Sequence, residues 1–183
     1  VETYFYLDGS TGLTTFPDNK GAYFGTGADL GIFHDGSHSY ITTDGTGDFY
    51  IRQATNDKDL IFQCDDGSGG LATYLTLDGT NVRTKFHKAV NLEDNVQLQV
   101  GNSQDLKLWH SGTHSYIAQE GVGNLYIYSG VDDGDIVFQS DDGSGSVETY
   151  FFLDGSAGAG TPITTFPDGS YLTFGGSQDI QIY

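Results

Sequence analysis

Apolar and polar residues alternate in short stretches along the whole chain. In the first half these stretches are DLGIF, SYITT, DFYIR, DLIFQ and ATYLTL, which begin at residues 29, 39, 48, 59 and 72. A period of two is typical of a β-strand with one buried face. Asp-Gly and Gly-Gly turn sequences separate the stretches by about ten residues, as in a β-meander. The pattern therefore predicts an all-β chain of short strands.

Helical patterns are nearly absent from the sequence. Residues 88–100 have a mildly helical look, but Val96, Leu98 and Val100 alternate with glutamines, which predicts a strand. Phe-Pro pairs at 16–17 and 166–167 predict turns, because proline fixes its own φ and keeps the preceding residue extended.

A repeat with an offset of 76 residues (110 minus 34) organises the chain. The segment HDGSHSYI at 34–41 returns as HSGTHSYI at 110–117, and the run DDGSG at 65–69 returns at 141–145. A second block, TYFYLDGS, begins at residue 3 and reappears in similar form at residues 73 and 149. A fixed period of this length is typical of proteins whose units bury their apolar faces against neighbouring units or chains.

The copies divide the chain into four segments. GGSQDIQIY at 175–183 resembles GNSQDLKLW at 101–109 and so begins a third copy. The segments are the end of a truncated repeat (1–24), two full repeats (25–100 and 101–174) and the start of a third (175–183). Because both ends fall inside a unit and the chain contains no Met, we expect a window cut from a longer array.

Composition adds constraints on the core and on partners. The chain has 27 Gly, 14% aromatic residues, 37% hydrophobic residues and a formal net charge of -18. This aromatic content is too high for a disordered chain, whereas the hydrophobic content predicts a thin core. Strong negative charge repels phosphate backbones and anionic headgroups, so we expect neither nucleic-acid binding nor direct membrane binding.

The repeated motif carries a family resemblance. The consensus DLxIxHDGSxSYIxxxGxGxLYI is approximated at 29–51 and again at 105–127. It resembles the repeats of tail-fibre and related structural proteins of marine bacteriophages, especially cyanophages. The second copy departs from the first at Trp109, where the first has Phe33, and at Ser111, where the first has Asp35. The resemblance implies a virion or extracellular location and an elongated, commonly homotrimeric appendage that supports host attachment.

Two architectures satisfy the strand edges that such short strands leave open. The preferred one is an intertwined homotrimeric β-helix or β-prism, and the alternative is a single-chain β-solenoid or β-meander array. Two other functions compete with a tail-fibre shaft: a glycan-binding adhesive module and a cellular extracellular filament or adhesin. Host surface glycans are therefore candidate partners beside other copies of the chain.

Histidines and aspartates are the candidate metal ligands, and we expect no other cofactor. A histidine pair flanks a turn in each copy and would suit a transition metal: His34, His38, His110 and His114. Aspartates in the Gly-rich turns would suit calcium: Asp57, Asp59, Asp65, Asp66, Asp133, Asp135, Asp141 and Asp142. The competing interpretations, which we favour, are histidines that hydrogen-bond at a strand end and aspartates that cap their own turns.

Catalysis is not expected. The acidic residues recur in each copy, whereas an enzyme such as a glycosidase needs one specialised carboxylate pair. Cys64 is matched by Ser140 in the second copy, so no nucleophile is supported. Trp109 and Tyr116 are candidates for stacking against sugars, although burial in a thin core is the favoured role for such aromatic side chains.

Overall fold

The computed structural model describes residues 2–158 and 160–182, and these residues form strands, turns and extended connections without a helix. The all-β prediction is therefore confirmed. The chain divides into two units, residues 1–91 and 92–183, and this division falls inside the predicted first full repeat. No helix in the described part of the chain is long and apolar enough to cross a membrane.

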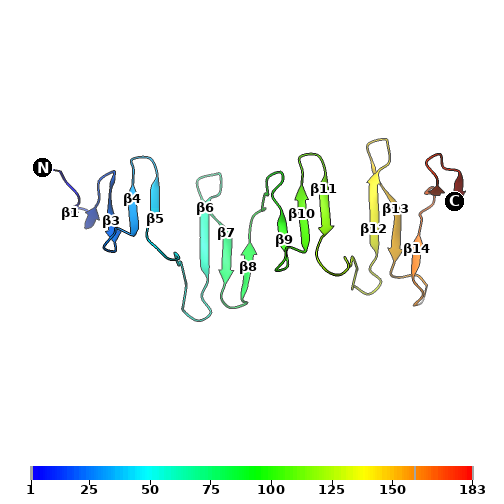
Figure 1. Cartoon of the computed structure of the whole chain (residues 1–183), viewed down its shortest axis with the longest axis horizontal. Helices are drawn as coiled ribbons and strands as arrows, with labels where there is room; N and C mark the ends of the chain where they lie inside the picture. Colours follow the sequence, from blue (N-terminus) through cyan, green and yellow to red (C-terminus); the bar gives the residue numbers. More distant parts are fainter. Residues whose placement is uncertain (1, 159, 183) are drawn as a thin grey trace. The chain divides into compact units, whose positions relative to one another are not determined.

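Unit 1 contains three small antiparallel sheets, and each is built from strands that follow one another in the sequence (Figure 1). One sheet is a two-stranded hairpin and the other two are three-stranded meanders. The hairpin consists of β1 (Tyr6–Asp8) and β2 (Leu13–Thr15). The meanders are β3 (Lys20–Phe24), β4 (Leu30–His34) and β5 (Ser39–Thr43), followed by β6 (Leu60–Asp65), β7 (Leu71–Asp78) and β8 (Arg83–Phe86).

Unit 2 contains two meanders equivalent to those of unit 1, in the order that the sequence repeat predicts. Its first meander is β9 (Leu98–Val100), β10 (Leu106–His110) and β11 (Ser115–Gln119), and its second is β12 (Ile136–Asp141), β13 (Val147–Asp154) and β14 (Ile163–Thr165). A hairpin follows, with β15 (Leu172–Phe174) and β16 (Ile180–Ile182). All pairings are antiparallel, because a short turn joins each strand to the next.

Local irregularities recur at the same offset as the sequence. The pairing register shifts directly after Phe62 in β6 and directly after Phe138 in β12, as it does at a β-bulge. Left-handed backbone is found at Ala28 (φ 58°) and at Gln104 (φ 59°), each in the turn before the central strand of its meander. The 76-residue repeat is therefore a repeat of backbone conformation as well as of sequence.

One predicted strand does not form. Four of the alternating stretches lie in β4, β5, β6 and β7, and the Val96–Val100 pattern yields β9. The stretch DFYIR at 48–52 is an irregular connection without strand pairing, and so is its counterpart at 124–128. The alternation predicted a strand here, but a strand needs a paired neighbour, and no other described segment pairs with either stretch.

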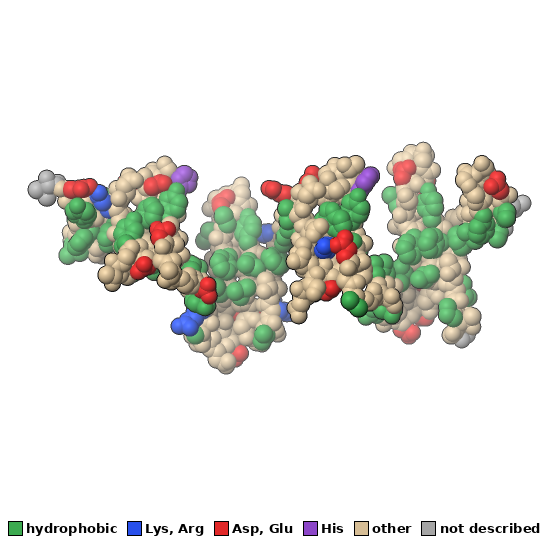
Figure 2. Space-filling view, viewed as in Figure 1, with side chains coloured by type: hydrophobic (Ala, Val, Ile, Leu, Met, Phe, Trp, Pro, Cys, Tyr) green, Lys and Arg blue, Asp and Glu red, His purple; other side chains and the backbone are tan. Residues whose placement is uncertain are grey.

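The two units lack a hydrophobic core of their own. No hydrophobic side chain in the described part of the chain is buried, and the buried polar residues are Thr76 and Asp78, each 5% exposed. In Figure 2 hydrophobic side chains lie open on the visible surface over the strands, while many acidic side chains lie near turns. Composition predicted a thin core, but the residues that the structure describes form no hydrophobic core within a single chain.

Candidate functional site

The histidine turn joins the last two strands of the first meander in each unit. His34, the last residue of β4, is opposite Ser39, the first residue of β5, and its Nδ1 lies 3.1 Å from the serine Oγ. In unit 2 the same pair is His110 and Ser115, with 3.0 Å between the two atoms. Each of these histidines therefore uses one ring nitrogen at the strand end, as the favoured interpretation of the sequence expects.

Asp35 organises the turn that follows His34. Its Oδ1 accepts hydrogen bonds from the backbone N–H groups of His38 and Ser37, both at 2.8 Å, and its Oδ2 accepts one from the Tyr40 hydroxyl at 2.9 Å. These bonds favour the charged carboxylate and hold the pKa of Asp35 below its usual value, with His38 N–H the largest cause. Ser111 occupies the equivalent position in unit 2, and its Oγ accepts a hydrogen bond from the His114 N–H at 3.1 Å.

The second histidine of each turn is not directed to a common ligand site with the first. The His38 Nδ1 lies 3.9 Å from Asp35 Oδ1, and the His38 side chain is 74% exposed. The ring of His38 is tilted against that of Tyr40, whereas the ring of His114 meets that of Tyr116 edge-on. In residues 2–158 and 160–182, no three His, Cys, Asp or Glu side chains are grouped in a way that would hold a metal ion.

The aspartate turns use their carboxylates internally. Asp66 Oδ1 accepts hydrogen bonds from the N–H and the hydroxyl of Ser68 and from the Gly70 N–H, at 2.7 to 3.0 Å. Asp65 accepts one from the Gly67 N–H at 2.7 Å. The Ser68 hydroxyl is the largest cause of a lowered pKa at Asp66. In unit 2 the same contacts are made by Asp141 and Asp142.

The other candidate calcium ligands also have structural roles. Asp57 and Asp133 adopt a left-handed backbone (φ 57° in both) at equivalent turns. Asp59 Oδ1 accepts a hydrogen bond from the Gly79 N–H at 3.0 Å, and Asp135 accepts one from the Gly155 N–H at 2.9 Å. The structure therefore separates the predicted ligands into distinct turns, and it supports the turn-capping interpretation for these carboxylates.

The candidate glycan-binding aromatics stack on each other. Trp109 in β10 and Tyr116 in β11 are direct cross-strand partners, with ring centroids 4.5 Å apart and planes at 15°. Phe33 and Tyr40 form the equivalent pair in unit 1, with centroids 4.9 Å apart. Tyr116 remains 40% exposed. Each ring covers one face of its partner, and the stack holds the two strands in register.

Sequence reasoning missed the most protected carboxylate. Asp78, at the end of β7, accepts hydrogen bonds from the Asn81 N–H and side chain, and it forms ion pairs with Lys85 and Arg83 of β8. The Lys85 ammonium is the largest cause that holds the pKa of Asp78 far below its usual value. The LDG triplet was a visible signal, because it occurs three times. The cationic partners of Asp78 gave no such signal in the sequence, because they lie on the neighbouring strand.

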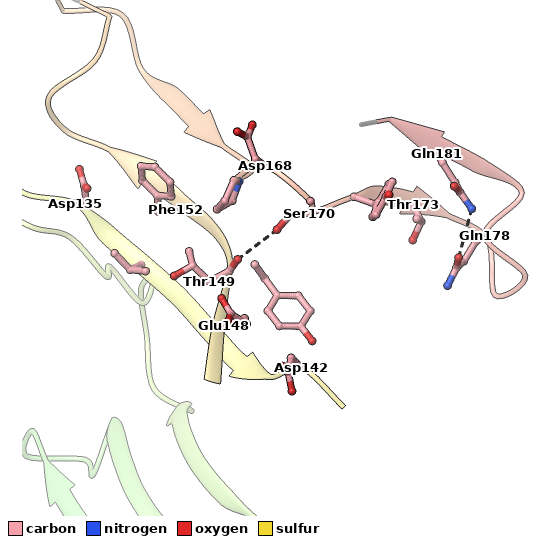
Figure 3. Close-up of a pocket in the computed structure, with 15 residues that line it drawn as sticks. Asp135, Asp142, Glu148, Thr149, Phe152, Asp168, Ser170, Thr173, Gln178 and Gln181 are labelled. Carbon is pink, nitrogen blue, oxygen red and sulfur yellow. Dashed lines mark hydrogen bonds between the residues drawn. The ribbon is translucent and has the colours of Figure 1, made fainter. Parts of the chain in front are cut away.

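Unit 2 also contains an open cleft that the sequence did not indicate. It has a volume of about 910 Å³ and lies between the β12–β13 hairpin and the connection to β15 (Figure 3). Asp142, Glu148 and Asp168 are among its lining residues, and the Ser170 hydroxyl donates a hydrogen bond to the Thr149 carbonyl oxygen across it at 3.3 Å. Its lining contains acidic and aromatic side chains but no Lys, Arg or His.

Comparison with known proteins identifies no relative: no protein-family model, no curated protein and no solved structure matches this chain.

Proposed function

We propose that this chain is a structural segment of an elongated virion or extracellular appendage, of the tail-fibre shaft type, in which several copies assemble to support attachment to a host. The observation that carries the proposal is the absence of any buried hydrophobic side chain in the described part of a chain with 14% aromatic residues. The hydrophobic effect is the main driving force of folding. Apolar side chains that stay exposed to water in one chain therefore favour association, because a second chain can bury them.

The amount of exposed surface supports an extensive assembly. The chain exposes 14844 Å². A compact monomer of 19.7 kDa would expose about 8,600 Å², and two separate compact halves about 10,000 Å². The excess is thus more than about 4,000 Å² per chain, several times the area of about 800 Å² that each partner buries in a standard interface. Interfaces of this size are typical of obligate, intertwined complexes.

Sheet size supports the same conclusion. The sheets have two or three short strands and no buried apolar face, and such sheets are marginal in water without further packing. A homotrimer is the preferred assembly, because three copies related by a cyclic axis close their strand edges against one another. The remaining face of the assembly would carry the negative charge of the turns.

Oligomeric state and stability test the proposal together. Sedimentation equilibrium should give a mass of three chains, and the unfolding temperature should rise with protein concentration, because folding and association are coupled. A monomer that unfolds cooperatively at a concentration-independent temperature would overturn the proposal.

A further inference from the structure

Two equivalent segments of the chain have no regular secondary structure and make no backbone pairing. They are residues 48–54, which follow β5 and a bend, and residues 124–130, which follow β11 and a bend. No hydrogen bond from another described residue reaches the backbone of either segment, and neither belongs to a sheet. Backbone N–H and C=O groups are strong donors and acceptors, and a β-prone segment with none of them paired is a template for another strand.

The side chains of both segments are those of a strand rather than of a linker. Tyr50 and Tyr126, which occupy equivalent positions, are each 76% exposed, and the isoleucines that follow them are 56% and 61% exposed. β-branched and aromatic residues are enriched in strands and depleted in flexible connections. Exposure that is reproduced in both repeats points to a surface that both repeats use in the same way.

Each segment is preceded by a strand with a free edge. β5 is the last strand of its meander, and it pairs on one side only, with β4. β11 pairs on one side only, with β10. β5 and β11 are five residues long, which is also the length of the alternating stretches 48–52 and 124–128. The chain therefore carries two strand-length segments without partners in its described part, and the free edges of β5 and β11, which directly precede them, match them in length.

We infer that residues 48–52 and 124–128 are intermolecular strands, each of which pairs with the free edge of β5 or β11 in a second copy of this chain. The inference rests on the proposed function and names the contact through which the copies associate. In one chain each segment leaves its own meander; in the assembly it becomes the fourth strand of a neighbour's meander. If each chain donates its segment to the next chain, and the last chain donates to the first, the copies form a closed ring.

A second copy of the chain fits these edges better than an unrelated partner. The two segments and the two edges recur at one offset of 76 residues, so the same contact with a second copy is available once in each repeat. Charge does not oppose the contact, although the chain as a whole carries -18. Stretch 48–52 contains one acid, Asp48, and one base, Arg52, and stretch 124–128 is uncharged. Apolar side chains on both partners would then be covered.

Disulfide trapping tests which strands meet. In a Cys64→Ser background, which removes the exposed cysteine in favour of the residue found at 140, one chain carries Ile41→Cys in β5 and an isotope-labelled chain carries Tyr50→Cys. These are the central residues of the two five-residue stretches, and cross-strand neighbours meet the distance requirement of a disulfide. After refolding the two chains together and oxidising them, we expect a disulfide-linked species of mixed mass as the main product.

The control for chance collision replaces Ile41→Cys with Val122→Cys, a fully exposed turn position (101% of its reference area). Mixed-mass product no more abundant than in this control would overturn the inference. A chain that carries both Ile41→Cys and Tyr50→Cys and forms only an internal disulfide would also overturn it, because the segment would then complete its own meander.

Proline substitution tests the role of the backbone. Tyr50→Pro with Tyr126→Pro removes an N–H and fixes φ at the centre of each segment, which disfavours a paired strand. The matched control is Asn56→Pro with Asp132→Pro, at exposed turn positions followed by a left-handed residue in each repeat, where proline is favoured. We expect the first pair to raise the concentration needed for half-assembly about tenfold or more and the control pair to leave it within about twofold.

The outcomes separate the inference from the proposal on which it rests. If the unmodified chain is a stable monomer, both fail. If it assembles, but Tyr50→Pro with Tyr126→Pro behaves like the control pair and no mixed disulfide forms, assembly stands and the intermolecular strands are wrong.

Discussion

The backbone N–H of Gly79 donates a hydrogen bond to the Asp59 carboxylate at 3.0 Å, and this bond joins two turns that are 20 residues apart in the sequence. A side chain at Gly79 would collide with the carbonyl oxygen of Lys58, and one at Gly155 would collide with that of Gly134. Glycine is needed at both positions for close approach, since neither has a positive φ.

Gly79→Ala and Gly155→Ala should therefore each destabilise the chain by about 1–3 kcal/mol, the usual cost of forcing an atom into occupied space. Chemical denaturation measures the change. Gly9→Ala is the matched control, because Gly9 occupies the same place in the first LDG triplet and an added Cβ there would meet no described atom within 4 Å. Equal destabilisation at Gly9 and Gly79 would contradict the steric explanation.

Lys85→Thr should change how the stability of the folded chain depends on pH. The pKa of Asp78 is lowered in the folded chain, so its contribution to stability is complete above the unfolded value of about 3.9 and is lost as the pH falls toward the folded value. Thr stands at the equivalent position in unit 2, where Thr165 pairs with Phe152 as Lys85 pairs with Thr76. The variant should unfold at a lower temperature at neutral pH, and it should begin to converge with the unmodified chain only as the pH falls below about 4.

Thermal unfolding between about pH 7 and pH 2 follows this convergence. Lys58→Thr removes the same charge from a side chain without an ion pair in the described part of the chain, and it should leave the pH dependence unchanged. A stability difference for Lys85→Thr that stays constant across the pH range would show that the ion pair with Asp78 is not its cause.

The aromatic pair of Trp109 and Tyr116 should be coupled energetically. A double-mutant cycle with Trp109→Leu and Tyr116→Leu should give a coupling energy of about 0.5–1.5 kcal/mol, the range for stacked rings. Trp109 is the single tryptophan, so its fluorescence reports directly on loss of the stack in Tyr116→Leu. A coupling energy near zero would contradict the structural role of the stack. It would favour the alternative, in which the two rings are independent platforms for sugars, and binding of a glycan by the unmodified chain would then test that alternative.

Removal of divalent cations should not affect stability. The turn carboxylates of Asp66 and Asp142 already accept three or more hydrogen bonds each. We therefore expect the unfolding temperature to be the same with EDTA and with added calcium. A rise with calcium that Asp66→Asn together with Asp142→Asn abolishes would establish the calcium site that the turn-capping interpretation rejects.

Higher ionic strength should strengthen assembly. Copies that each carry -18 repel one another, and salt shortens the range of this repulsion from about 14 Å at 0.05 M to about 4 Å at 0.5 M. Sedimentation at both salt concentrations should show a lower concentration for half-assembly at the higher one. Assembly that weakens with salt would instead indicate that ion pairs between chains dominate the contact.

Local features were predictable because they depend on neighbours in the sequence. Alternation in 30–34 and 39–43 predicts β4 and β5, and the DDGSG run predicts the turn that Asp66 caps, because period and turn chemistry act over a few residues. Comparison of the two copies also identified Cys64 and its counterpart Ser140 as interchangeable. The 76-residue repeat needed no structure at all.

Other features depended on which segments meet. The alternation in 48–52 equals that of the true strands, yet the stretch has no partner among the described residues. Strand pairing depends on edges that are distant in sequence or belong to another molecule. The Asp78 site likewise arises only when β8 brings Lys85 beside β7. The all-β class, the turns and the repeat follow from patterns along the chain. Strand pairing and the protection of Asp78 emerge only in the folded chain, because both require contacts that no local pattern encodes.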